Sequence, residues 1–170
     1  MDAFEAITTR RSVREFTDRE VGDRELDRLI EAARWAPSGL NNQPWRFMKV
    51  TDRSLIEDLS HMTKYRGVVA GAPALMAVFI DADQMYDRTK DLMSAGAAIQ
   101  NLLLAAHETG MGACWLGEIL GKREDVQALL EVPDSFEFVA LVALGWPVER
   151  ERSGVRHPPE KFVVQPPERT

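Results

Sequence analysis

The apolar run Ala74-Leu75-Met76-Ala77-Val78-Phe79-Ile80 is the feature that most constrains the fold. It is continuous, contains no polar residue, and is bounded by Pro73 and Asp81. A strand with one buried face alternates apolar and polar side chains, whereas a strand covered on both faces stays apolar throughout. The run therefore predicts a central strand of a sheet that is covered on both faces.

Other elements follow from apolar spacing and from capping residues. We predict strands over residues 45–50 and 136–144. The pattern predicts a short helix over residues 2–9, with Phe4 and Ile7 as its inward pair, and an amphipathic helix that ends near Trp35. Further helices are predicted after the cap residue Asp52 and over residues 124–130, whereas residues 64–71 show no clear period.

The longest predicted helix covers residues 91–109 and ends at Gly110. It is apolar on nearly all sides, which is typical of a buried helix. The order of elements predicts an α+β sandwich with a mixed β-sheet between helices. We predict a single domain over residues 1–170, of which residues 148–170 form an extended C-terminal tail because they are rich in Arg, Glu and Pro and show no period.

The amino-acid composition restricts the kinds of molecule that the protein is expected to bind. The net charge of −6 argues against a nucleic acid bound through a general basic surface, so we expect no nucleic-acid partner. No apolar run approaches the ~20 residues of a membrane span, and the first residues do not form a signal peptide. We therefore expect no membrane association and a cytoplasmic protein, which the single Cys114 also fits.

The segment Ala36-Pro37-Ser38-Gly39-Leu40-Asn41-Asn42-Gln43-Pro44-Trp45-Arg46-Phe47 lies between a predicted helix and a predicted strand. The prolines fix φ at two points, and Ser38-Gly39 allows a close approach of the backbone to a ligand. Three successive amide side chains can read a polar ring edge or a sugar-like chain. An ordinary turn rich in turn-forming residues is the alternative, and this segment alone does not decide between them.

A second segment, Arg10-Arg11-Ser12-Val13-Arg14, concentrates three guanidinium groups within five positions of an acidic chain. Such a cluster suits a small anion, because guanidinium makes bidentate contacts to phosphate. The alternative is a solvated charged turn that is balanced by nearby acidic residues.

Together the two segments resemble motifs of the nitroreductase family of FMN-dependent oxidoreductases. Gly112-Ala113-Cys114-Trp115-Leu116-Gly117 adds a third match, and a weaker one lies around Arg156. The resemblance implies an intertwined homodimer with FMN at the subunit interface. It also implies that hydride passes from NADH or NADPH through flavin N5 to a nitroaromatic, quinone or similar acceptor.

The resemblance implies a role for each matching residue. Arg10, Ser12 and Arg156 would hold the FMN phosphate, Arg11 would lie along the ribityl chain, and Arg14 would tune the flavin near N1/O2. The backbone of Leu116 and Gly117 would face flavin N5. Residues from the other subunit would reach the flavin: Pro37, Ser38, Gly39, Asn41 and Gln43. Gly39 stands where a serine is common in the family, and the chain is too short for the helical excursion that covers the flavin in larger members.

No other catalytic pattern competes with this interpretation. The histidines are far apart and show no metal-ligand spacing, so we expect no metal site. We expect no catalytic side chain either, since the cofactor would carry the chemistry. The alternatives are a flavin-binding or storage protein without turnover, a purely structural α/β domain, and a specialised family activity such as flavin destruction or dehalogenation.

Overall fold

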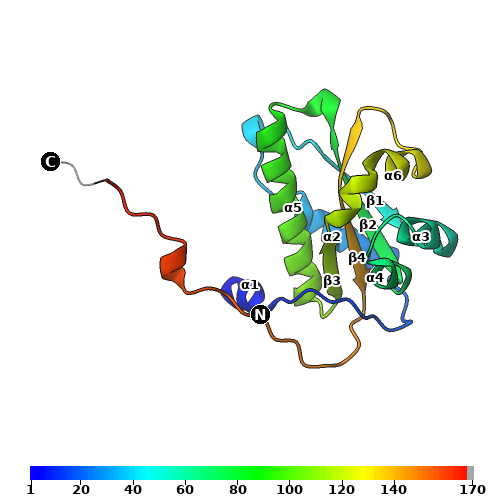
Figure 1. The fold of residues 1–170 in the computed structure, drawn as a ribbon, viewed down its shortest axis with the longest axis horizontal. Helices are drawn as coiled ribbons and strands as arrows, with labels where there is room; N and C mark the ends of the chain where they lie inside the picture. Colours follow the sequence, from blue (N-terminus) through cyan, green and yellow to red (C-terminus); the bar gives the residue numbers. More distant parts are fainter. Residues whose placement is uncertain (168–170) are drawn as a thin grey trace.

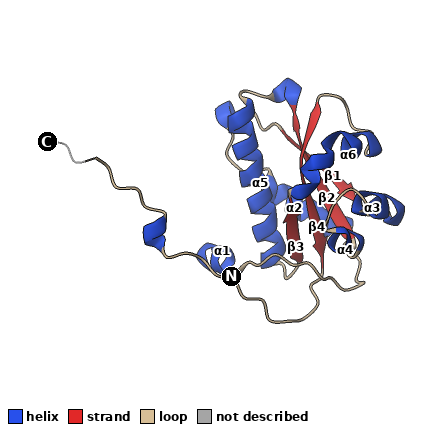
Figure 2. Ribbon diagram, viewed as in Figure 1, coloured by secondary structure: helices blue, strands red, loops and turns tan. Residues whose placement is uncertain are grey.

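The computed structural model describes residues 1–167, which form a four-stranded sheet with helices on both faces (Figures 1 and 2). The strands are β1 (Trp45–Val50), β2 (Ala74–Asp81), β3 (Gly112–Leu116) and β4 (Phe136–Gly145), in the order β1-β2-β4-β3. Both strands predicted outside the central run are confirmed, and the α+β class is confirmed with them.

The strand directions differ from the expected mixed sheet. All three strand pairs are antiparallel, and the one parallel pairing among residues 1–167 is the isolated bridge between Ser12 and Ala113. The reason lies in the connections. Val50 at the end of β1 pairs with Leu75 near the start of β2, so the intervening helices return the chain to the end of the sheet that it left.

Two helical layers enclose the sheet. Helices α2 (Asp23–Ala33) and α5 (Arg88–Glu108) cover one face, and α3 (Arg53–Ser60), α4 (Arg66–Ala70) and α6 (Arg123–Leu129) cover the other (Figure 1). All eight residues of β2 are buried, which confirms the prediction from its apolar run. Alternate residues of β2 pack into the two separate apolar cores.

Helix ends agree with the capping residues. The Asp52 carboxylate accepts from the backbone N–H of Leu55 at 2.9 Å, and Gly110 ends α5 with φ of 80°. Helix α5 begins three residues before its predicted start, because the Asp87 carboxylate caps it by accepting from the N–H of Lys90. Helix α4 was not expected from the pattern, since its five residues are too few to show a period.

The predicted inward pair of helix α1 (Ala3–Thr9) is wrong. Ala6 is its only buried residue, whereas Phe4 is 76% exposed and Ile7 is 55% exposed. The helix packs against α5 with Ala6 buried and leaves the side chains of Phe4 and Ile7 largely exposed. A spacing pattern shows that an apolar face exists but not which molecule covers it.

The chain after Pro147 leaves the body of the protein. Residues 148–167 run outward with one short turn, Pro159–Lys161, and Val155, Phe162 and Val164 are exposed (Figure 1). Near its start the segment is fixed by an ion pair of 2.7 Å between Arg150 and Glu15. Within residues 1–167, no helix is both long enough and apolar enough to cross a bilayer.

Candidate functional site

The first part of the site is positioned by the outer edge of β3. Ser12 pairs with Ala113, and the Val13 N–H donates to the Ala113 carbonyl oxygen at 3.0 Å. A Cβ on Gly112 would lie 2.6 Å from Val13 Cγ1, so glycine allows this close packing. The contact lays the arginine segment alongside the first residues of β3.

We call the cavity over this edge the arginine cleft. Its volume is about 500 Å³, and it is lined by the arginine segment and by the first part of the tail: Arg10, Arg11, Ser12, Arg14, Arg150, Glu151, Arg152, Ser153, Gly154 and Arg156. The cleft thus brings together the three residues predicted to hold the phosphate, Arg10, Ser12 and Arg156, with Arg11 and Arg14.

Most of the positive charge of the cleft is not compensated by an ion pair among the described residues, although Arg150 pairs with Glu15. Among residues 1–167, no carboxylate lies within ion-pair distance of Arg10, Arg11, Arg14 or Arg156. The Nε atoms of Arg10 and Arg11 are buried without a hydrogen-bond partner. Buried donors without partners are rare and costly, so a cleft of this kind favours an anionic ligand.

Mutual repulsion supports the same conclusion. Burial lowers the pKa of Arg10, and the positive charges of Arg156 and then Arg11 lower it further. An anion in the cleft would offset this repulsion and would partner the buried donors.

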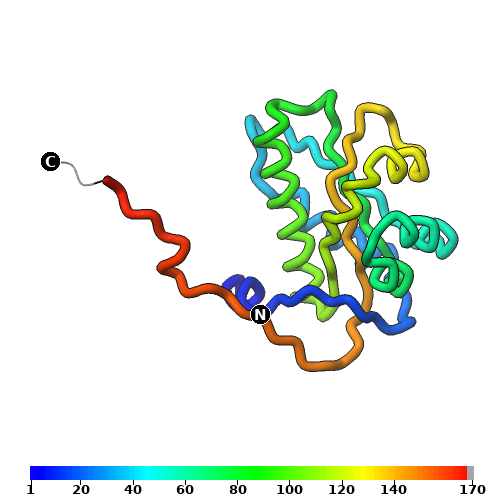
Figure 3. The backbone as a smooth tube through the Cα atoms, in the orientation of Figure 1, coloured from blue at the N-terminus to red at the C-terminus, as the bar shows by residue number. Residues whose placement is uncertain are grey.

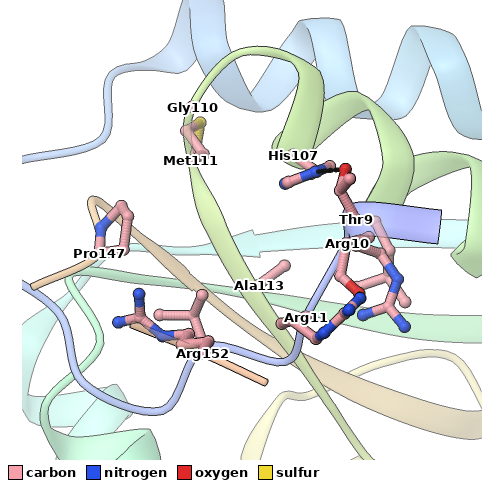
Figure 4. A pocket seen from close by; sticks show the side chains of 11 residues that line it. Thr9, Arg10, Arg11, His107, Gly110, Met111, Ala113, Pro147 and Arg152 are labelled. Carbon is pink, nitrogen blue, oxygen red and sulfur yellow. Dashed lines mark hydrogen bonds between the residues drawn. The ribbon is translucent and has the colours of Figure 1, made fainter. Parts of the chain in front are cut away.

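A smaller cavity of about 300 Å³ lies beside the arginine cleft (Figure 4). There the Thr9 hydroxyl and His107 Nε2 are 2.8 Å apart, which ties the end of α1 to the end of α5. Burial lowers the pKa of His107, and Arg10 and Arg11 lower it further. This histidine is a hydrogen-bonded helix residue.

Neither metal ligation nor a cysteine nucleophile is indicated. No three His, Cys, Asp or Glu side chains gather at metal-binding distance in the described part of the chain. Cys114 is buried, and burial raises the pKa of its thiol, although Arg14 and Arg10 oppose the shift. At the end of the same strand Leu116 is buried, whereas Gly117 is exposed and a Cβ there would meet no atom within 4 Å.

The second part of the site is the bend, which we define as residues 37–43. It lies at the other end of α5 from the arginine segment (Figure 3). Asn42 Nδ2 donates to Asp91 Oδ1 at 3.0 Å and to the Gln84 carbonyl at 2.9 Å. The Ser38 hydroxyl accepts from the N–H of Gln43 at 3.0 Å, which closes the bend on itself.

The predicted ligand-facing residues of the bend are accessible. Pro37, Asn41 and Gln43 are exposed, and Ser38 and Gly39 are half-buried. A Cβ on Gly39 would lie 2.8 Å from Tyr86 Cδ1. This contact gives a physical reason for glycine where the family resemblance led us to expect serine.

One chain does not bring the two parts together. The bend contacts α5 at Asp91, and the end of α1 contacts it at His107, sixteen residues farther along. At 1.5 Å per residue, these contacts are about 24 Å apart along the helix. The predicted site residues therefore form two sets at opposite ends of the same helix.

The sequence analysis did not identify several residues that hold the bend in place. Arg46 Nη1 donates to the Gln43 carbonyl at 3.2 Å, and its Nη2 pairs with Asp81 at 2.7 Å. Asn42 and Asp91 hold the bend on α5.

Comparison with known proteins identifies the family of the chain. The profile of the nitroreductase family matches residues 7–64 and 54–146. A relative from Methanothermobacter thermautotrophicus, provisionally named NADH dehydrogenase/NAD(P)H nitroreductase, is 33% identical over 97% of this chain and 87% of its own. A relative named 5,6-dimethylbenzimidazole synthase from Rhodospirillum rubrum is 32% identical over 82% of this chain and 79% of its own.

Solved structures extend the likeness to the tertiary fold. The crystal structure of a provisionally named nitroreductase from Desulfovibrio desulfuricans, in complex with FMN, has a TM-score of 0.91 and 39% identity, and the match covers 98% of each chain. The family profile ends at residue 146, whereas this structural match extends into the tail. The shared profile, the shared fold and the matching motifs lead to one conclusion: the chain belongs to the nitroreductase family.

Proposed function

We propose that this protein is an FMN-dependent NAD(P)H oxidoreductase that reduces a small acceptor, such as a nitroaromatic compound or a quinone, as a homodimer. Family membership and the FMN complex of a relative with 39% identity support the cofactor. A relative named FMN reductase [NAD(P)H], from Bacillus subtilis, is 25% identical over 94% of this chain, and its name supports the co-substrate.

The arginine cleft is the observation that carries the proposal. The guanidinium groups of Arg10, Arg11, Arg14 and Arg156 lack carboxylate partners among the described residues, and the buried Nε atoms of Arg10 and Arg11 have no hydrogen-bond acceptor. The FMN phosphate is a dianion that fits this set of donors. In this assignment Arg10, Ser12 and Arg156 bind the phosphate, Arg11 contacts the ribityl chain, and Arg14 lies toward the ring.

The separation of the two residue sets supports the dimer. The bend cannot reach a ligand in the arginine cleft of its own chain, because its contact with α5 is about 24 Å along the helix from the cleft side. In a symmetric dimer, the second chain's bend can face the first chain's cleft. The apolar faces left uncovered on α1 and α5, including Phe4, Ile7 and Met93, are suited to the contact between chains.

When bound, FMN supplies hydride transfer between NAD(P)H and the acceptor. The chain then has to bind the flavin, orient it and leave its reactive edge open. Exposed Gly117 leaves space at the end of β3, and the Arg14 cation stabilises negative charge on the reduced ring. The side-chain amides of Asn41 and Gln43 can bind polar groups of the flavin from the second chain.

The visible spectrum of the purified protein tests the proposal. We expect flavin absorbance that is bleached by anaerobic NADH or NADPH and restored by a quinone. A flavin storage protein would stay yellow in excess reduced nicotinamide. A structural domain would be colourless, and its melting temperature would not rise with added FMN.

Flavin destruction is a second candidate function, because a relative with 32% identity is named 5,6-dimethylbenzimidazole synthase. The two functions differ in the fate of the cofactor. Chromatography of the flavin after many turnovers should recover it intact from an oxidoreductase, whereas a flavin-destroying enzyme would consume it. Cytoplasmic location and the identity of the acceptor also remain predictions.

A further inference from the structure

The bend has a backbone that requires external support. Leu40, Asn41 and Gln43 have φ values of 53°, 56° and 49°, which lie in the left-handed region. Residues with a Cβ adopt this region at an energetic cost, which is greater for Leu40 and Gln43 than for Asn41 because asparagine enters the region more readily. Three such residues within four positions need a firm anchor.

Asp91 supplies the anchor. Its side chain is fully buried, and its carboxylate accepts from Asn42 Nδ2 at 3.0 Å and from the backbone N–H groups of Tyr86 and Asp87 at 2.7 and 3.0 Å. All of these donors are neutral. Because no cationic side chain pairs with Asp91 within residues 1–167, this buried carboxylate depends on the hydrogen bonds from these donors.

The same carboxylate fixes both sides of the bend. It holds Asn42 directly, and it holds the backbone of Tyr86, whose ring packs against Gly39. Asn42 Oδ1 is buried without a partner, so the orientation of this amide is set by the two acceptors of its Nδ2, Asp91 and Gln84. Removing the Asp91 carboxylate would release both the Asn42 side chain and the backbone of Tyr86.

We propose that Asp91 is a positioning residue that pre-forms the bend for binding the flavin in the second chain's arginine cleft. The inference rests on the proposed function and adds to it a residue that touches neither cofactor nor substrate. A pre-formed bend lowers the conformational cost of binding, so its loss should weaken affinity for the flavin ring and ribityl chain. It should not alter recognition of the phosphate, which belongs to the arginines.

The test uses Asp91→Asn in the full-length dimer, with flavin fluorescence titrations of FMN and riboflavin. The introduced side-chain amide replaces one acceptor oxygen with an NH₂ group, which then faces N–H donors that the carboxylate had accepted from. We expect dissociation constants for both flavins to rise about tenfold or more, as for loss of a hydrogen bond to a charged group. Because both ligands lose the same contacts, the ratio of the two constants should not change. If Asp91→Asn does not fold, Asn42→Ala provides a second test. It removes the hydrogen bond to Asp91 from the side of the bend and should weaken the binding of both flavins in the same way.

Glu137→Gln is the matched control. Glu137 is a shielded carboxylate that pairs with Arg88 at the start of α5 and with Arg123, and it does not contact the bend. We expect this variant to lose thermal stability and to keep both flavin affinities. Unchanged affinities in folded Asp91→Asn, or equal weakening in Glu137→Gln, would overturn the role of Asp91. Wild-type protein that fails to bind FMN would instead overturn the proposed function, and this inference with it.

Discussion

The arginine cleft and the bend differ in charge and in how far their polar groups are already paired within the chain. The cleft gathers like charges, leaves two buried Nε atoms without partners, and lowers the pKa of Arg10 by burial and repulsion. The bend carries no net charge. It is held by hydrogen bonds to Ser38, Asp91 and Gln84, with three residues in a strained backbone region.

The difference shows which part of a ligand each region can recognise. If the cleft binds the FMN phosphate as proposed, its contribution to binding is electrostatic and depends on the phosphate. The bend is already complete, so its contribution depends on shape and on amide hydrogen bonds. Substitutions in the two regions should therefore affect FMN and riboflavin differently.

The largest effect is expected from Arg10→Ala combined with Arg156→Ala. Loss of two charge-assisted contacts should weaken FMN binding by about 100-fold or more and should leave riboflavin binding nearly unchanged. Fluorescence titration of both flavins measures the two effects. Arg66→Ala is the control, because Arg66 pairs with Glu57 on the opposite layer of the sandwich and should change neither affinity. Equal loss for both flavins would contradict the phosphate assignment.

A smaller effect is expected from Arg14→Ala. Removing a cation near the ring should disfavour the electron-rich reduced flavin and lower the reduction potential by on the order of tens of millivolts. Spectroelectrochemical titration measures this potential, and Arg14→Lys should retain most of it because the charge is kept. An unchanged potential in Arg14→Ala would remove its tuning role.

The smallest effect concerns His107 and the pH dependence of stability. Its pKa is lowered in the folded state, so the unfolded chain binds the proton more readily. The contribution of His107 to stability is complete above its ordinary pKa of about 6.5 and is lost as the pH falls below that value. Melting temperatures of the protein without flavin should fall less between pH 7.5 and about 5.5 in His107→Asn than in wild type. If the melting temperature falls equally with pH in wild type and in His107→Asn, His107 does not contribute to the pH dependence of stability.

Much of the fold could be predicted from local pattern. The continuous run of β2 and the caps at Asp52 and Gly110 each depend on neighbouring residues alone, and each is confirmed. Helix α4 was missed because five residues carry too little periodicity. The inward pair Phe4 and Ile7 was wrong because apolar spacing shows that an apolar face exists but not that the protein's own core covers it.

The two parts of the site could be predicted to different extents. The arginine segment and the bend were recognisable as motifs, since their residue types are unusual in such short spans. That Asn42 would turn inward onto Asp91 could not be read from the sequence, because the partners are 49 positions apart. Tertiary contacts of this kind are set by packing around α5.

Subunit mixing tests most directly whether each flavin is bound by the cleft of one chain and the bend of another. One parent carries Arg10→Ala with Arg156→Ala, and the other carries Asn41→Ala with Gln43→Ala, so neither binds FMN tightly alone. After exchange of subunits, a random mixture should regain tight FMN binding at about one quarter of its sites, because half of its dimers combine an intact cleft with an intact bend at one of their two sites. If both parts of a site came from the same chain, every site in the mixture would keep a defect and tight binding would not return.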